Sequence, residues 1–260
     1  MVRREKTNYV IQSVAHSLDV LEQFFGEVDE LGVTELSKRL KLHKNNVFRL
    51  LATLEARGYI EQNRSTENYR LGIKCLHVGR RYIHHMGLVK QARPILAEVA
   101  KRCHESAFVA IARRDGVVPL EAAEPEGQMV RITSPIGQTL PLHCTAVGKT
   151  HLAFDLDEQF RSVLPEHLER HTARTIVERD QLLEQLNAAA RAGYSTDNGE
   201  FFTDIASIAV PIRDYTRSVV GSLAIAGPVY RLSAERISSE LAPIVLDAGR
   251  ELSHRLGFNE

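Results

Sequence analysis

Residues 34–71 read TELSKRLKLHKNNVFRLLATLEARGYIEQNRSTENYRL, and the order of apolar and polar positions predicts two short helices. In the first helix, Leu36 and Leu40 are four residues apart and share one face. The second helix is longer, and its apolar positions follow the three-and-four spacing of a buried face: Val47, Leu50, Leu51 and Leu54. A tight turn at 41–43 separates the two helices.

A hairpin is expected after the second helix. Gly58 ends that helix, because glycine readily adopts the left-handed backbone found after helix C-termini. Residues 59–62 and 68–71 are strand-like runs on either side of a polar tip at 63–67. Helix, turn, helix and hairpin in this order predict a winged helix-turn-helix.

Basic residues gather around this motif, although the whole chain has 33 Lys and Arg against 33 Asp and Glu. Between Lys38 and Arg93 there are thirteen basic residues and three acidic ones, a net charge of +10, so the rest of the chain carries −10. A positive patch of this size neutralises phosphates and releases counterions. The charge distribution therefore favours double-stranded DNA as a partner of the N-terminal part.

Base reading requires polar side chains near the start of the second helix, because that end of a recognition helix enters the major groove. The candidates there are Lys44, Asn45, Asn46 and Arg49. Asn pairs with adenine, and Arg or Lys pairs with guanine. Arg64 at the hairpin tip is a candidate for a backbone or minor-groove contact. The alternative for each residue is an ordinary solvated charged face, and only their combination with the turn, hairpin and charge favours DNA binding.

Composition places the protein among cytoplasmic globular proteins. The chain has 260 residues, enough for two domains, and 43% of them are hydrophobic. It contains no run of about 18 apolar residues, so no membrane association is expected. Residues 1–8 are too polar and charged for a secretory signal.

No metal or other cofactor is expected from the sequence. Cys75, Cys103 and Cys144 are widely separated and odd in number, which argues against disulfides and against a cysteine-based zinc site. His77 and His84 are seven residues apart, whereas a helical metal pair usually has a spacing of four.

Helices are predicted on both sides of the winged motif. Ser13 is expected to cap the first helix of the chain. Its predicted core face, at spacings of four, three and four, consists of Val14, Leu18, Leu21 and Phe25. After the hairpin, residues 72–86 lack acidic residues and are expected to form a linker helix between two domains.

Helices and strand-like runs alternate in the second half of the chain. Helices are predicted at 94–104, at 178–192 started from Thr175, and from a Ser233 cap towards Leu256. Strands are predicted at 107–113, 117–123, 129–136, 207–213 and 218–226. Antiparallel strands flanked by helices make this half an α+β domain.

Three phrases of this half resemble one family. They are LPLHCTAVGK at 140–149, GYSTDNGE at 193–200, and IAVPIRD at 208–214 followed by AGP at 226–228. Together with RLLATLEARGY at 49–59, they resemble the IclR-type transcriptional regulators over nearly the whole chain.

The resemblance implies a domain order and a function. It implies a winged helix-turn-helix domain at 9–72, a linker helix at 73–87 and a GAF-like effector-binding and oligomerisation domain at 88–260. It further implies a homodimer or a dimer of dimers that controls a catabolic operon in response to a small-molecule effector.

The resemblance also indicates an effector site. Its expected residues are Leu142, Cys144, Thr145, Ala146, Asp197, Glu200, Ser207, Ala224 and Ala226. Residues 144–146 open a helix whose free backbone N–H groups can receive a carboxylate.

Some positions depart from the family pattern. Ser207 stands where many relatives have cysteine, and alanines at 224 and 226 replace two serines. The loss of two hydroxyls suits an aromatic or largely apolar acid or phenol better than a heavily oxygenated molecule. In the DNA-binding part, His43 stands where relatives often have a serine helix cap.

Two other functions are possible alternatives for this sequence. An enzyme is disfavoured: the phosphate-loop phrase at 148–150 has His143 where that motif needs glycine. Cys144 beside His143 lacks a recognisable orienting group, and Asp197 with Glu200 lacks a nucleophile. A DNA-binding protein whose second domain only mediates oligomerisation stays open.

Overall fold

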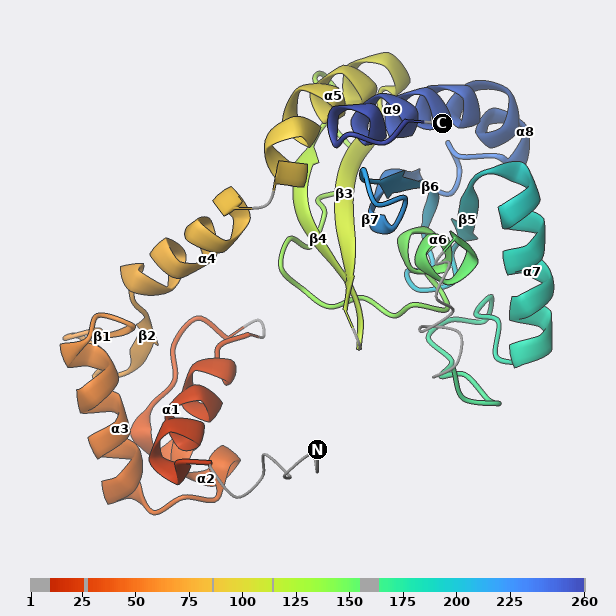
Figure 1. The fold of residues 1–260 in the computed structure, drawn as a ribbon. Coiled ribbons are helices and arrows are strands. Elements are labelled where there is room, and N and C mark those ends of the chain that lie inside the picture. The colour runs from red at the N-terminus through yellow and green to blue at the C-terminus, as the bar shows by residue number, and fades with distance from the viewer. Residues whose placement is uncertain (1–9, 26–27, 86, 114, 155–163, 260) are drawn as a thin grey trace, which may run out of the picture. The chain divides into compact units, whose positions relative to one another are not determined.

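The computed structural model describes residues 10–25, 28–85, 87–113, 115–154 and 164–259, with the backbone alone for residues 80–85. The chain divides into two compact units, Met1–His85 and Met86–Glu260, and Figure 1 shows their elements. No helix in the described ranges is long and apolar enough to span a membrane.

The first unit is the predicted winged helix-turn-helix followed by a helix. Its elements are α1 (Gln12–Glu22), α2 (Val33–Leu40), α3 (Lys44–Ala56), β1 (Ile60–Gln62), β2 (Tyr69–Leu71) and α4 (Ile73–His85). The strands β1 and β2 pair antiparallel, and Leu31 bridges to Tyr69 beside them. Leu36, Val47, Leu51, Leu54 and Ile60 are buried in one apolar core with Val20 and Phe24 of the first helical segment.

Local chemistry explains the turn between α2 and α3. Lys41 ends α2 with a left-handed backbone, at φ 55°. His43 caps α3, because its Nδ1 accepts a hydrogen bond from the backbone N–H of Asn45 at 3.3 Å. At the other end of α3, Gly58 has φ 77°, as expected for a glycine after a helix C-terminus.

The predictions for α1 were wrong in two respects. Its N-cap is Ile11, which has no capping side chain, and Ser13 lies inside the helix. The apolar stripe of Val14, Leu18 and Phe25 is exposed, by 54%, 54% and 72%, whereas Val20 and Phe24 are buried. The helix has two apolar stripes, and packing against α2 and α3 selects the other one.

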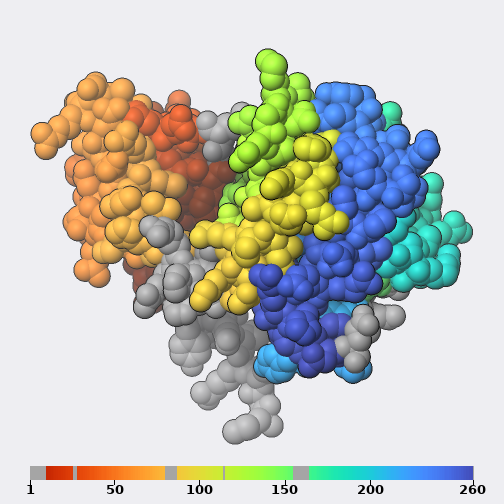
Figure 2. Space-filling view, turned by 90° about the horizontal axis from the view of Figure 1, so that it is seen from above, coloured from red at the N-terminus to blue at the C-terminus, as the bar shows by residue number. Residues whose placement is uncertain are grey.

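The second unit is a five-stranded antiparallel sheet with helices on both faces. The strand order is β4 (Gly116–Ala123), β3 (Ser106–Arg113), β7 (Val219–Pro228), β6 (Ile205–Arg213) and β5 (Ser195–Asn198). On one face lie α5 (Gly87–Cys103) and α9 (Ala242–Arg255), side by side in Figure 2. On the other face lies α6 (Ala146–Phe154), with α7 (Arg179–Ala192) beside it (Figure 1).

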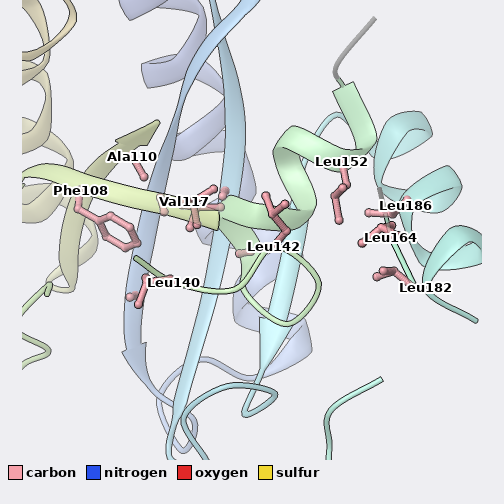
Figure 3. Close-up of a cluster of buried hydrophobic side chains, with 14 of the residues drawn as sticks. Phe108, Ala110, Val117, Leu140, Leu142, Leu152, Leu164, Leu182 and Leu186 are labelled. Atoms are coloured by element: carbon pink, nitrogen blue, oxygen red, sulfur yellow. The ribbon is translucent and has the colours of Figure 1, made fainter. Parts of the chain in front are cut away.

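The core of this unit explains the near-continuous apolar strands. Because helices cover both faces, β3, β6 and β7 are buried along most of their length. Figure 3 shows Leu152 of α6 facing Leu182 and Leu186 of α7, while Phe108 and Leu140 meet at the other end of the cluster.

Other predictions for this unit had mixed outcomes. The Ser233 cap is confirmed, because its hydroxyl accepts a hydrogen bond from the backbone N–H of Arg236 at the start of α8 (Ala234–Arg236). The helix α8 continues through a π-helical turn (Ile237–Leu241) into α9. The predicted strand at 129–136 was wrong, since this stretch has no regular structure and Met129 is 98% exposed. The helix α7 starts after Glu178 and not from Thr175, whose hydroxyl is instead bonded to the carbonyl of Glu200.

The start of α6 packs unusually close to the loop before it. A Cβ atom added at Gly148 would lie 2.3 Å from the carbonyl oxygen of Leu142. This contact is the structural reason for the glycine in the phrase at 148–150.

We predict that Gly148→Ala lowers the free energy of unfolding by roughly 1–3 kcal/mol, the usual cost of overpacking a tight site. The matched control is Gly79→Ala in α4, where an added Cβ meets nothing within 4 Å. There the better helix propensity of alanine should stabilise the helix by up to about 1 kcal/mol. Urea denaturation of both variants tests this, and equal effects at the two glycines would contradict it.

Candidate functional site

The start of α3 presents the side chains predicted to meet DNA. Lys44, Asn45, Asn46 and Arg49 are all exposed, while Val47 between them is buried. Arg64 lies exposed at the tip between β1 and β2. The structure thus places four of the five on one helix terminus and the fifth on the wing.

Phe48 was missed by the sequence reasoning. Its ring is 57% exposed, although a phenylalanine in a helix is normally expected in the core. It is three residues after Asn45 and adjacent to Arg49, so it lies beside the polar candidates. Its exposure could have been predicted, because Phe48 lies outside the spacing of the buried residues Val47, Leu51 and Leu54.

In the second unit, Asp197 is a buried carboxylate at the end of β5. Its Oδ1 accepts from the backbone N–H of Glu200 at 2.8 Å, and its Oδ2 accepts from the Ser207 hydroxyl at 3.3 Å. Burial, with the nearby Glu200 charge, raises the pKa of Asp197 to about 7, against the lowering effects of these bonds and of Lys149. Asp197 therefore exchanges its proton near neutral pH.

A buried ion pair lies next to Asp197. Lys149 of α6 is 1% exposed, and its Nζ lies 2.5 Å from the Glu200 carboxylate. The same ammonium donates to the carbonyl of Thr196 at 3.1 Å. The pair ties α6 to β5 and to the segment that follows it.

A cavity of about 270 Å³ opens beside Asp197. Most of its lining is apolar, with three polar groups from Thr145, Asp197 and Ser207 joined by Thr133 and Ser134. The apolar lining residues are Phe108, Ile132, Pro135, Leu140, Val147, Phe201, Phe202, Ile205 and Ala226. A larger depression of about 610 Å³ lies against β6 and α9, and its lining contains none of the predicted effector residues.

The structure brings only some of the predicted effector residues to this cavity. Thr145, Asp197, Ser207 and Ala226 line it. Leu142, Cys144, Ala146, Glu200 and Ala224 do not: Glu200 is turned to Lys149, and the other four are packed in the core or in the loop before α6. Sequence motifs locate a segment, whereas the side-chain direction depends on the fold.

Thr145 acts first as the cap of α6. Its hydroxyl accepts from the backbone N–H of Gly148 at 3.1 Å and donates to the carbonyl of Pro141 at 2.7 Å. The backbone N–H groups of Ala146 and Val147 have no carbonyl of their own helix to donate to.

Several residues that line the cavity were not predicted from the sequence. Ser134 is buried, and its hydroxyl has no hydrogen-bond partner within the described part of the chain. Phe201 and Phe202, whose rings meet edge to face at 4.4 Å, follow directly after Glu200 of the quoted phrase. Two adjacent aromatics after an acidic phrase were the signal that could have revealed them.

We predict that Asp197 makes stability fall as pH rises. A carboxyl group with a folded pKa of about 7, against an ordinary value of 3.8, binds more protons in the native state between these two pH values. Unfolding free energy should therefore decrease from about pH 4 to about pH 7, by on the order of a few kcal/mol. In Asp197→Asn this component of the decrease should be absent.

Chemical denaturation at several pH values tests this prediction. The control is Asp204→Asn, because Asp204 is exposed and seven residues away. Its stability profile should run parallel to that of the wild type. Parallel profiles for wild type and Asp197→Asn would overturn the prediction.

Known proteins that this chain resembles belong to one family. The model of the bacterial transcriptional regulator IclR C-terminal domain matches residues 80–254, and that of the IclR helix-turn-helix domain matches residues 13–64. The HTH-type transcriptional regulator KdgR of Escherichia coli is 32% identical over 96% of this chain and 94% of its own length.

Solved structures agree with these matches. An IclR-type transcriptional regulator from Alicyclobacillus acidocaldarius has a TM-score of 0.84, 26% identity, and coverage of 96% of this chain and all of its own. An IclR homolog from Microbacterium hydrocarbonoxydans, solved with 4-hydroxybenzoate, has a TM-score of 0.81, 22% identity, and coverage of 94% and 99%. This chain belongs to the IclR family of DNA-binding transcriptional regulators.

Proposed function

We propose that this regulator responds to a small aromatic or otherwise largely apolar acid or phenol, bound in the cavity beside Asp197. The observation that carries the proposal is the lining of that cavity, in which nine of fourteen residues are apolar and three are phenylalanines. An apolar wall with a few convergent polar groups is the usual composition of a small-molecule site.

The size of the cavity favours a single ring. An apolar cavity of about 150 Å³ is large enough for benzene. The 270 Å³ here leaves room for a ring with one or two substituents. A homolog of the same fold holds 4-hydroxybenzoate, a ring with one carboxylate and one hydroxyl, which supports this ligand class.

The polar groups define how such a ligand is held. No Lys or Arg is among the described residues that line the cavity, so a carboxylate would be received by the Ser134 hydroxyl, by backbone N–H groups at the start of α6, or by protonated Asp197. A phenol would instead donate to ionised Asp197. The unpartnered Ser134 hydroxyl is available to either ligand.

The alternative functions are less well supported. Burial, together with the charges of Asp197 and Glu200, raises the pKa of Cys144 to about 12, so its thiol is not a ready nucleophile. A second unit that only assembled oligomers would not need an apolar cavity with a buried acid beside it. The characterised relatives reported above are transcriptional regulators.

The proposed mechanism is a two-state coupling. Effector binding beside Asp197 favours one arrangement of the sensing domains in a homodimer or a dimer of dimers, and α4 carries this to the DNA-binding domains. The spacing of two recognition helices must match the operator half-sites, so a change in spacing changes affinity. The proposed target is the operator of a catabolic gene cluster.

We predict that Arg49→Ala costs ~1–3 kcal/mol in operator binding and relaxes specificity at the base pair that it reads. Phe48→Ala should relax the preference for a thymine, since its exposed ring is suited to contact the thymine methyl group. Lys74→Ala, in α4, should weaken binding less and equally across sequences.

The measurement is fluorescence anisotropy at one fixed salt concentration, using an operator selected from a random library by the wild-type protein. Equal affinities of wild type and Arg49→Ala for that operator and its single-base variants would show that α3 does not dock as proposed.

We predict that an aromatic acid or phenol raises the melting temperature of the wild type, because a ligand that binds only the native state stabilises it. The panel should also contain glyoxylate, pyruvate and sugar acids. The shift should shrink in Asp197→Asn and persist in Asp204→Asn. Tighter binding of glyoxylate or pyruvate than of every aromatic compound would contradict the proposed ligand class.

The pH dependence of binding identifies the contact with Asp197. A carboxylate that accepts from protonated Asp197 should lose affinity by roughly tenfold per pH unit above about pH 7. A phenol that donates to ionised Asp197 should gain affinity up to about pH 7 and then level off. Affinity that is independent of pH in the wild type would exclude Asp197 as the contact.

A further inference from the structure

Three metal-ligating side chains meet in the loops before α6 and α7. One ligand atom from each of His143, Cys144 and His171 lies within 4.8 Å of the other two. His143 and Cys144 are buried and His171 is half-buried. The sequence separates His171 from the other two by more than twenty residues, so only folding brings the three together.

Hydrogen bonding leaves the Nδ1 lone pair of His143 free. Nε2 of His143 lies 2.9 Å from the carbonyl oxygen of Glu169. A carbonyl only accepts, so Nε2 carries the proton and Nδ1 keeps its lone pair. A backbone carbonyl bonded to the far nitrogen is the usual way in which a metal-binding histidine is oriented. Nε2 of His171 is buried and has no partner within the described part of the chain.

The cluster borders a cavity of about 370 Å³ that is distinct from the effector cavity. His143 and His171 line it, together with Leu164 and Leu168, and Asp115 and Glu169 are also among its lining residues. An ion entering this cavity would meet the two imidazoles first, with the buried thiol of Cys144 behind them.

We propose that His143, Cys144 and His171 form a binding site for a borderline transition-metal ion of the zinc type. Two imidazoles and one thiolate are the ligands that such ions prefer, while hard cations such as magnesium prefer oxygen. Without an ion Cys144 is a neutral thiol, because burial raises its pKa. Coordination replaces its S–H bond by a metal–sulfur bond, and the thiol proton passes to solvent.

The site is connected to the effector cavity. Cys144 precedes Thr145, and the ring of His171 packs edge to face on Phe201 at a centroid distance of 4.9 Å. Thr145 and Phe201 both line the cavity beside Asp197. Further along the His171 loop, Thr172 donates to the carbonyl of Gly199 at 2.7 Å. A bound ion would hold these two walls of the effector cavity in a fixed position.

Cobalt titration of the full-length, chelator-treated protein without oxygen tests the proposal. One equivalent of Co²⁺ should produce the near-ultraviolet thiolate-to-cobalt charge-transfer band, and Zn²⁺ should remove it by competition. Cys144→Ser should lose the band. His171→Phe, which keeps an aromatic ring against Phe201, should bind Zn²⁺ at least about 100-fold more weakly, since even outer-shell partners contribute 10–100-fold.

Matched controls separate this site from adventitious binding. Cys75→Ser and Cys103→Ser should keep the band, and all variants should show wild-type circular dichroism. Cobalt held by histidines elsewhere gives no thiolate band. A wild type without the band, or a band that survives in Cys144→Ser, overturns the proposal while leaving the effector cavity and its aromatic ligands to their own test.

Discussion

The buried ion pair of Lys149 and Glu200 is the interaction on which the second unit depends. Removing an ammonium and a carboxylate from water costs several kcal/mol for each ion, and only close geometry with further hydrogen bonds offsets this. Here the charges are 2.5 Å apart, and the carbonyl of Thr196 accepts a second bond from Lys149. The start of α6 is thereby held at a fixed distance from β5.

The pair also determines the chemistry of its neighbours. Glu200, fixed by Lys149, presents its backbone N–H to Asp197, and its carbonyl accepts from Thr175. Asp197 thus remains at the edge of an apolar cavity with a pKa of about 7, and the loop carrying His171 is held against the same segment. One buried salt bridge therefore helps to position Asp197. It also holds the loop that carries His171, near His143 and Cys144.

Local sequence patterns were sufficient to predict most helices and strands, but not which way their side chains face. The spacing of Val47, Leu51 and Leu54 predicted α3, and Gly58 predicted its end, because both depend on neighbours in sequence. For α1 the spacing predicted the wrong core face, because the helix has two apolar stripes and packing against α2 and α3 determines which one is buried. The prediction of a strand at 129–136 was also wrong: this stretch has no regular structure, and its Ile132 carbonyl is bonded by the Ser106 side chain.

Patterns within the sequence were enough to predict the winged helix-turn-helix, the charge separation, the antiparallel α+β unit and the segments that line the candidate site. Spacing, caps and charge are properties of residues close together in the chain. Long-range packing determines which of the predicted residues line the cavity, that Glu200 faces Lys149 instead, and that His171 lies beside His143 and Cys144. These features depend on contacts between residues far apart in the chain, and such contacts form only when the core folds.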